Sequence, residues 1–197
     1  MLPVAAGPER LTEAMRSLEA AFLIGVQGVT EIWLVRHADC YQDMSNEADP
    51  PLSPLGRTQA ERLARRVREL KPAAVYASPY RRALETARAI TDDVRVDDRL
   101  VEMEMTLGDD GGFEFRELPA SVIERMSGAV SEIAQSHPGE RVIVVAHGAA
   151  MMMFLTHLLR LEPGQLRFLP YFTSVNLVRV LGDRQMVGTL GDIAHLE

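Results

Sequence analysis

The chain is organised around residues 33–39, which read Trp33-Leu34-Val35-Arg36-His37-Ala38-Asp39. The run Ile32 to Val35 is apolar without a polar alternate, which is the pattern of a short strand buried on both faces. In an open α/β sheet, ligands bind just beyond the carboxyl ends of the strands. A strand that ends at Arg36 and His37 therefore places a permanent positive charge and a titratable nucleophile where such folds do chemistry.

A second apolar strand ends in the same way far downstream. Residues 142–146 form the run Val-Ile-Val-Val-Ala, and His147 and Gly148 follow it directly. Two strands that each deliver a histidine to the same edge of a sheet make a candidate site. The plainer alternative is a pair of structural histidines that hydrogen-bond to the backbone.

The composition limits the classes of protein to which this chain can belong. The 197 residues are 47% hydrophobic and 25% charged, which indicates one globular domain spanning residues 1–197. The net charge of −7 argues against a general affinity for nucleic acid or an anionic membrane. One cysteine, Cys40, excludes an intrachain disulfide, and the chain shows no signal peptide and no membrane-spanning apolar run. We expect a cytoplasmic protein.

Short strands and helices alternate along the chain, and Ser53-Pro54 reads as the capped start of a helix. This alternation predicts an α/β fold, a three-layer α/β/α sandwich with a mostly parallel central sheet and an antiparallel edge from the last hairpin. Strands are predicted at 32–35, 73–77, 94–96, 142–146, 175–181 and 186–190, and helices at 54–70, 80–90, 118–135 and 149–159.

Residues 1–29 form an N-terminal extension that carries a predicted helix over 8–24. Its large apolar residues follow a 4-3-4 spacing, which gives one apolar stripe. The stripe consists of Leu11, Met15, Leu18 and Phe22. It either packs on its own domain or forms a dimer contact, and the pattern alone does not name the partner, so a homodimer stays open.

The predicted helix over 54–70 is rich in arginine. Its arginines are Arg57, Arg62, Arg65, Arg66 and Arg68. Glu61 and Glu69 interrupt the series, which favours an ordinary solvated face over a nucleic-acid surface.

A phosphoryl group suits the edge where the two histidines lie. The group carries close to two negative charges, and planar guanidinium groups bind it well. Its transfer depends mainly on positioning and charge stabilisation. Arg36, Arg82 and His147 could surround the phosphate and leave His37 free to attack phosphorus.

This reaction makes two further demands on the sequence. The attacking imidazole must be neutral, and two nearby arginines would favour that form by like-charge repulsion. The leaving alcohol needs a proton from a carboxylic acid. Glu102 and Glu104 are the candidates, and because they project to the same side of an extended segment, spacing does not choose between them.

A metal centre is the main rival for this site, because His37, Asp39 and His147 are all ligand types. A metallophosphatase would gather several carboxylates and histidines, whereas this set is rich in arginine. The sequence also has neither a Walker loop nor a Gly-x-Gly-x-x-Gly turn. We therefore expect no metal ion and no cofactor.

Four blocks, in order, carry a resemblance to a known family. They are Leu34-Val35-Arg36-His37, Leu52-Ser53-Pro54-Leu55-Gly56-Arg57-Thr58-Gln59-Ala60, Ala77-Ser78-Pro79-Tyr80-Arg81-Arg82-Ala83-Leu84-Glu85-Thr86-Ala87 and Val144-Val145-Ala146-His147-Gly148. They resemble the Arg-His-Gly signature, the following helix start, the second phosphate arginine and the second histidine of the histidine phosphatase (phosphoglycerate mutase-like) superfamily.

The resemblance implies a role for each matched residue. His37 would be the phosphorylated nucleophile, and Arg36, Arg82, His147 and Gly148 would bind the phosphate. The neighbouring Arg81 would be a surface residue. Leu100-Val101-Glu102 resembles the Leu-x-Glu that carries the proton donor, which favours Glu102.

Some positions depart from the family pattern. Ala38 replaces the usual glycine, and Cys40 stands where the family often has threonine or serine. Asp43 occupies the expected asparagine position, and Asn46 is the nearest asparagine. These changes affect the loop that contacts the substrate rather than the reacting groups.

The family divides into mutases, which return the phosphoryl group to an intermediate, and phosphatases, which pass it to water. A short cap over about 103–138, with one helix to form a cover, favours hydrolysis of a small phosphorylated metabolite. The alternatives are a phosphoprotein or phosphohistidine phosphatase, a phosphoglycerate mutase, and a non-catalytic phosphate-binding protein.

Overall fold

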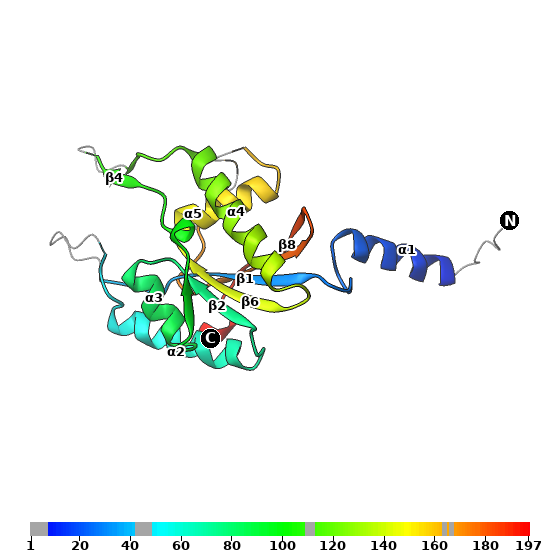
Figure 1. Cartoon of the computed structure of the whole chain (residues 1–197), viewed down its shortest axis with the longest axis horizontal. Helices are drawn as coiled ribbons and strands as arrows, with labels where there is room; N and C mark the ends of the chain where they lie inside the picture. The colour runs from blue at the N-terminus through cyan, green and yellow to red at the C-terminus, as the bar shows by residue number, and fades with distance from the viewer. Residues whose placement is uncertain (1–7, 42–48, 109–112, 163–164, 166–167) are drawn as a thin grey trace.

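The computed structural model of the protein describes residues 8–41, 49–108, 113–162, 165 and 168–197. A sheet with the strand order β3-β2-β6-β1-β7-β8 runs through the middle of the molecule (Figure 1). Its strands are β1 (Thr30–Arg36), β2 (Ala74–Ala77), β3 (Val94–Val96), β6 (Arg141–Ala146), β7 (Val175–Leu181) and β8 (Arg184–Asp192). The first four in spatial order pair in parallel, and β7 and β8 close the edge antiparallel.

Two helices cover each face of this sheet. Helices α2 (Pro54–Arg68) and α3 (Arg81–Arg88) lie on one side, and α4 (Pro119–Ser136) and α5 (Gly148–Leu158) on the other (Figure 1). Alternation along β1 explains both layers, because Ile32 and Leu34 pack with α4 and α5, whereas Val35 packs with α2 and α3. The predicted three-layer sandwich is confirmed. No helix in the described part of the chain is long and apolar enough to span a membrane.

The start of α2 is fixed to the loop that follows β1. Ser53 caps the helix, and its Oγ accepts the Gly56 N–H at 3.0 Å. A Cβ on Gly56 would lie 1.8 Å from the carbonyl oxygen of Asp39, so only glycine fits there. The helix start therefore packs directly against the residues after His37.

The N-terminal helix α1 (Pro8–Ala21) projects away from the body of the molecule (Figure 1). The four residues of its apolar stripe are 49–67% exposed. The end of α1 is anchored by Leu23, which is buried, and by Arg184, whose Nη2 donates to the carbonyl of Ala21 at 2.8 Å. The interpretation that the stripe packs on its own domain is wrong for the described residues.

The expected cap over 103–138 divides into two different structures. Strands β4 (Met105–Leu107) and β5 (Phe113–Phe115) pair as a small antiparallel hairpin that the sequence did not predict. The turn expected at 108–112 lies outside the described residues, apart from Gly108. Helix α4 buries Val122, Met126 and Val130 in the core against the sheet. The expectation that this helix covers the site is therefore wrong.

Three arginines of α2 are bound rather than simply solvated, which corrects the prediction for that face. Arg66 forms an ion pair with Asp192 at 2.5 Å, and Arg62 donates to the carbonyl of Leu196 at 2.5 Å. Arg68 donates to the carbonyls of Ala89 and Ile90 at 2.5 and 3.0 Å. Residue Leu196 belongs to the short helix η2 (Ala194–Leu196) at the end of the chain.

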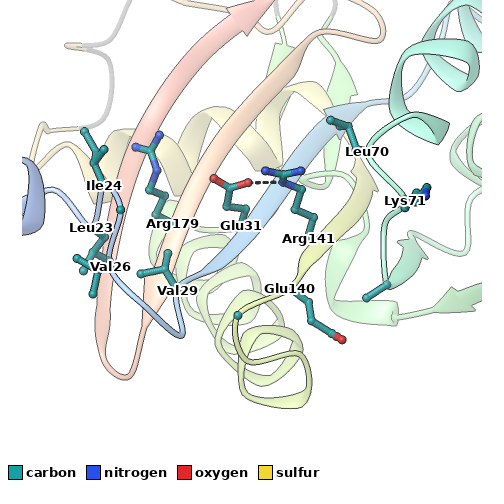
Figure 2. Close-up of a pocket in the computed structure, with 13 residues that line it drawn as sticks. Leu23, Ile24, Val26, Val29, Glu31, Leu70, Lys71, Glu140, Arg141 and Arg179 are labelled. Atoms are coloured by element: carbon teal, nitrogen blue, oxygen red, sulfur yellow. Dashed lines mark hydrogen bonds and ion pairs between the residues drawn. The ribbon is translucent and has the colours of Figure 1, made fainter.

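A hollow of about 470 Å³ lies at the amino ends of β1 and β6. Figure 2 shows Glu31 between Arg141 and Arg179 on the floor of this hollow, with apolar residues such as Ile24 and Val29 at one side. The Arg141 Nε lies 2.7 Å from the Glu31 Oε2. The amino edge of the sheet is thus charged, but its central charges are paired.

Candidate active site

The register of β1 and β6 brings the two strand-end histidines together. Arg36 pairs with Ala146, so His37 and His147 leave the sheet at the same level. The His37 N–H continues the ladder by donating to the carbonyl of Ala146 at 2.9 Å. Both side chains are buried, and their ring centroids are 5.1 Å apart. Two apolar strands far apart in sequence therefore place two imidazoles side by side.

The hydrogen bonds of His37 assign its tautomer. Its Nδ1 lies 2.7 Å from the carbonyl oxygen of Ala38, which can only accept, so the proton sits on Nδ1. The Nε2 then carries a lone pair, and the Arg82 Nε donates to it at 3.3 Å. Burial, together with the charges of Arg82 and Arg36, lowers the pKa of His37 from 6.5 to about 3 despite the opposing bond to Ala38. At neutral pH the ring is uncharged.

Arg82 reaches the site from the first turn of α3. Its Cζ lies 4.8 Å from the centroid of the Tyr80 ring, and its Nη1 lies 3.3 Å from the Asp49 Oδ1. The neighbouring Arg81 points outward and pairs with Glu85 at 2.8 Å. The structure thus directs Arg82 into the site and Arg81 toward the surface, as the sequence indicated.

Arg36 lies flat between an aromatic ring and a glycine. Its Cζ is 4.0 Å from the centroid of the Phe172 ring, and its Nη1 donates to the carbonyl of Pro170 at 2.7 Å. A Cβ on Gly148 would lie 3.2 Å from the Cζ and Nε of Arg36, so glycine allows this close approach. Burial lowers the pKa of Arg36, and the nearby Glu102 opposes that effect.

His147 is fully buried beside Ser78. Its Nε2 lies 2.7 Å from the Ser78 Oγ, and its Nδ1 has no hydrogen-bond partner among the described residues. The Arg36 Nε is a second buried nitrogen without a partner in the same part of the chain. Burial, and after it the electrostatic effects of His37, Arg82 and Arg36, hold the pKa of His147 well below its ordinary value of 6.5. Buried nitrogens without a partner, one of them on a permanently charged guanidinium, suit an anionic ligand at this edge of the sheet.

The two candidate acids differ in position. Glu102 lies at the amino end of α5, where its Oε1 accepts the Ala150 N–H at 2.9 Å and its Oε2 accepts the Ala149 N–H at 3.3 Å. A carboxylate is favourable at a helix amino end. Glu104 is exposed, and its carbonyl accepts the Arg116 N–H at 2.8 Å in the small hairpin. The structure brings Glu102, but not Glu104, close to Arg36 and Gly148.

Residues 32–112 and 106–193 match the model of the histidine phosphatase superfamily, branch 1. The chain belongs to the histidine phosphatase superfamily. Phosphoglycerate mutase-like protein 4 of Arabidopsis thaliana is 28% identical to it over 203 residues, covering 85% of this chain and 87% of the relative. A metal-independent phosphoserine phosphatase of the same plant is 27% identical, covering 85% and 84%. The family resemblance read from the four blocks is confirmed.

Solved structures share the fold of this histidine phosphatase. The protein YhfR of Bacillus stearothermophilus is 28% identical with a TM-score of 0.71, covering 85% of this chain and 100% of that one. The phosphoserine phosphatase of Entamoeba histolytica, solved in complex with 3-phosphoglyceric acid, is 20% identical with the same TM-score and coverage. These structures show that the chain has the fold of its superfamily.

The loop after His37 is where this histidine phosphatase departs from the family pattern. The Asp39 carboxylate accepts a short hydrogen bond from the Ser53 hydroxyl, which ties the loop to α2. Cys40 is half-buried, and burial raises the pKa of its thiol although Arg82 opposes the effect. Asp43 and Asn46 lie outside the described residues. The thiol is therefore held in its protonated form beside the site.

Several residues of the site were not singled out from the sequence. Ser78 and Tyr80 stand in the block around Arg82, so a reading of that block for hydrogen-bonding and aromatic partners could have found them. Phe172 and Pro170 come from an irregular segment before β7, which has no periodicity to mark it.

As for a metal centre, the described residues include no cluster of three or more His, Cys, Asp or Glu side chains that could hold an ion.

Proposed function

We propose that this protein is a phosphomonoesterase that hydrolyses phosphate esters through a phosphohistidine on His37. The observation that carries the proposal is the state of that ring. It is neutral, its tautomer is fixed by Ala38, and among the described residues its Nε2 lone pair accepts a hydrogen bond from the Arg82 Nε. A nucleophile needs this availability of electrons at a defined atom.

In the first step, a phosphate ester displaces the Arg82 guanidinium from the ring nitrogen. Arg36, Arg82 and the Nδ1–H of His147 then bind the phosphate oxygens. The His37 Nε2 attacks phosphorus in line, the bond from phosphorus to the ester oxygen breaks, and Glu102 transfers its proton to the departing alkoxide.

In the second step, water replaces the alcohol. Glu102 now takes a proton from that water, whose oxygen attacks the phosphorus of phosphohistidine. The bond between phosphorus and Nε2 breaks, inorganic phosphate leaves, and His37 returns to its neutral form. The same carboxyl group thus acts as acid and then as base.

Hydrolysis is favoured over transfer to a second substrate by the small size of the cover. Between Glu102 and His147, helix α4 belongs to the sandwich, which leaves the β4–β5 hairpin, among the described residues of that segment, to extend over the site. A site of this kind admits water to the phosphoenzyme. Two relatives of similar fold are named phosphoserine phosphatases, which supports a small phosphorylated metabolite as substrate.

The first experiment measures turnover of para-nitrophenyl phosphate by the wild type and by His37→Ala, with and without a chelator. We expect wild-type turnover that the chelator does not change, and a loss of at least about a thousandfold in the variant. Wild-type turnover by His37→Ala would refute the proposal. A panel of phosphoserine, 3-phosphoglycerate and a phosphopeptide then sharpens the substrate class, and faster turnover of the peptide would shift it to phosphoproteins.

A further inference from the structure

The C-terminal segment of the chain folds back onto α2. Asp192 at the end of β8 pairs with Arg66 through two hydrogen bonds, at 2.5 and 2.9 Å. The Arg62 Nη1 donates to the carbonyl of Leu196 at 2.5 Å and fixes the helix η2. The segment therefore has a defined position although it lies at the end of the chain.

Within this segment, His195 connects α2 to the segment before β7. Its Nδ1 lies 3.4 Å from the Arg66 Nη1, and an arginine can only donate, so Nδ1 accepts. Its Nε2 lies 3.0 Å from the Thr173 Oγ1 and therefore donates to that oxygen. Burial and the charge of Arg66 lower the pKa of His195, in agreement with a neutral ring.

Thr173 is a strained residue. It is fully buried and β-branched, and its φ of 58° lies in the left-handed region that such residues avoid. Its N–H donates to the carbonyl of Arg36 at 3.0 Å, and its hydroxyl donates to the carbonyl of Phe172 at 2.7 Å. The same hydroxyl oxygen is left to accept from His195. The strained turn is thus held from one side by β1 and from the other by the C-terminal segment.

This turn shapes one wall of the candidate active site. The Phe172 ring, next in the chain to Thr173, lies 4.0 Å from the Arg36 Cζ and 5.7 Å from the centroid of the His37 ring. The carbonyl of Pro170 in the same segment accepts the Arg36 Nη1–H. The orientation of the Arg36 guanidinium therefore depends on residues 170–173.

We propose that His195 is a positioning residue for the phosphoryl-transfer site. It holds the strained turn at Thr173 through one hydrogen bond, and the turn in turn holds Phe172 and the Pro170 carbonyl against Arg36 and His37. The proposal rests on the proposed function, because the groups that it positions are those assigned to bind and attack the phosphate.

The test compares His195→Ala with His195→Gln, in which the amide nitrogen replaces the imidazole Nε2 as donor to Thr173. His157→Ala is the matched control, since His157 is an exposed histidine on α5. We expect kcat for para-nitrophenyl phosphate to fall about tenfold or more in His195→Ala, because small displacements of positioned groups are costly. We expect His195→Gln to stay within about threefold of the wild type, and the control within about twofold.

Two further readouts separate positioning from loss of structure. Trp33 is the single tryptophan of the chain, and its ring lies 5.8 Å from the Arg66 Cζ, so its fluorescence reports on the docking of the C-terminal segment. We expect far-ultraviolet circular dichroism to be unchanged in both variants. If His195→Ala does not fold, kcat is compared among the wild type, His195→Gln and Thr173→Ser, which keeps the accepting hydroxyl. Retention of kcat in both variants supports the role of His195, and a loss in His195→Gln overturns it.

Binding of inorganic phosphate, measured by calorimetry, distinguishes this inference from the proposed function. A wild type that binds phosphate without turning over the ester would refute the proposed function. The role of His195 would then be decided by comparing the phosphate affinity of the variants with that of the wild type. Wild-type kcat and phosphate affinity in His195→Ala would overturn the inference. A loss in His195→Ala that His195→Gln does not restore would overturn it as well.

Discussion

The two ends of β1 carry similar charges in opposite settings. At the amino end, Arg141 is paired with Glu31 at 2.7 Å and its side chain is 50% exposed. At the carboxyl end, Arg36 is half-buried, and in the described part of the chain it forms no ion pair. Its Nε has no partner at all among those residues. Strand β1 therefore ends beside a surface ion pair on one side and, on the other, at an arginine without an ion-pair partner among the described residues.

This difference shows what makes one edge of the sheet a candidate active site. Both edges have arginines, and the amino edge even has the hollow of about 470 Å³ (Figure 2). Charges in water are screened, whereas buried charges act strongly on their neighbours. At the carboxyl edge, two half-buried arginines flank the neutral, buried imidazole of His37, so charge and burial together mark this edge as the candidate site.

The largest expected effect concerns the acid at the carboxyl edge. Glu102→Gln keeps the hydrogen bonds to the amino end of α5 in part but removes the proton that the leaving group needs. We expect kcat for an alkyl phosphate to fall by about 10²–10⁴-fold in steady-state assays. Glu104→Gln, the matched control from the exposed neighbour, should stay within about twofold of the wild type. The reverse order of effects would assign the proton donor to Glu104 instead of Glu102.

A matched pair of arginine substitutions tests the comparison directly. Arg36→Lys keeps the charge but loses the planar fork, so we expect kcat/KM to fall by about a hundredfold. Arg141→Lys makes the same change at the amino edge, where the charge only pairs with Glu31, and should leave kcat/KM unchanged within about twofold. Equal effects of the two substitutions in the same assay would break the contrast between the two ends of β1.

The buried histidine predicts a dependence of stability on pH. The pKa of His37 is about 3 in the folded chain against an ordinary value of 6.5, so the unfolded chain binds more protons between these values and stability falls as pH decreases through that window. At pH 4.5 His37 alone should lower the free energy of unfolding by about 2–3 kcal/mol relative to pH 7. Urea unfolding of wild type and His37→Asn at both pH values measures the difference. A wild type that loses no more stability than the variant would contradict the assignment.

The smallest expected effect concerns the ion pair at the amino edge. Glu31→Gln removes a partly exposed surface charge, and such pairs contribute about 1 kcal/mol or less. We expect the midpoint of thermal unfolding to shift by only a few degrees and turnover to remain at the wild-type level. A large loss of activity would show that the amino edge is coupled to the site after all.

The sequence predicted the carboxyl edge well because the local pattern determines it. Short apolar runs rich in β-branched residues that stop at Arg36-His37 and at His147 favour buried strands, and parallel strands deliver their ends to one edge. Spacing alone could not choose between Glu102 and Glu104, because both project to the same side of an extended segment, and only the family resemblance favoured Glu102. The structure adds a tertiary contact that spacing does not encode, since it places Glu102 at the amino end of α5.

Other features depended on contacts that no local pattern encodes. The spacing of Leu11 and Phe22 predicts an apolar stripe but not what covers it, and the described chain leaves it exposed. The wall formed by Phe172 and Thr173 comes from an irregular segment, where neither a period of two nor one of 3.6 applies. Such residues become visible only when the fold brings the segment against β1.

The pairing of Arg36 with Ala146 has a consequence for how this protein can vary. The exposed loops between the two strands can lengthen or shorten, because the pairing of β1 with β6 sets where His37 and His147 emerge. One residue inserted within β6 would instead turn every later side chain of that strand to the opposite face and carry His147 away from its partner. We therefore expect insertions and deletions to be tolerated in the exposed loops of the intervening chain but not inside the six paired positions of β1 and β6.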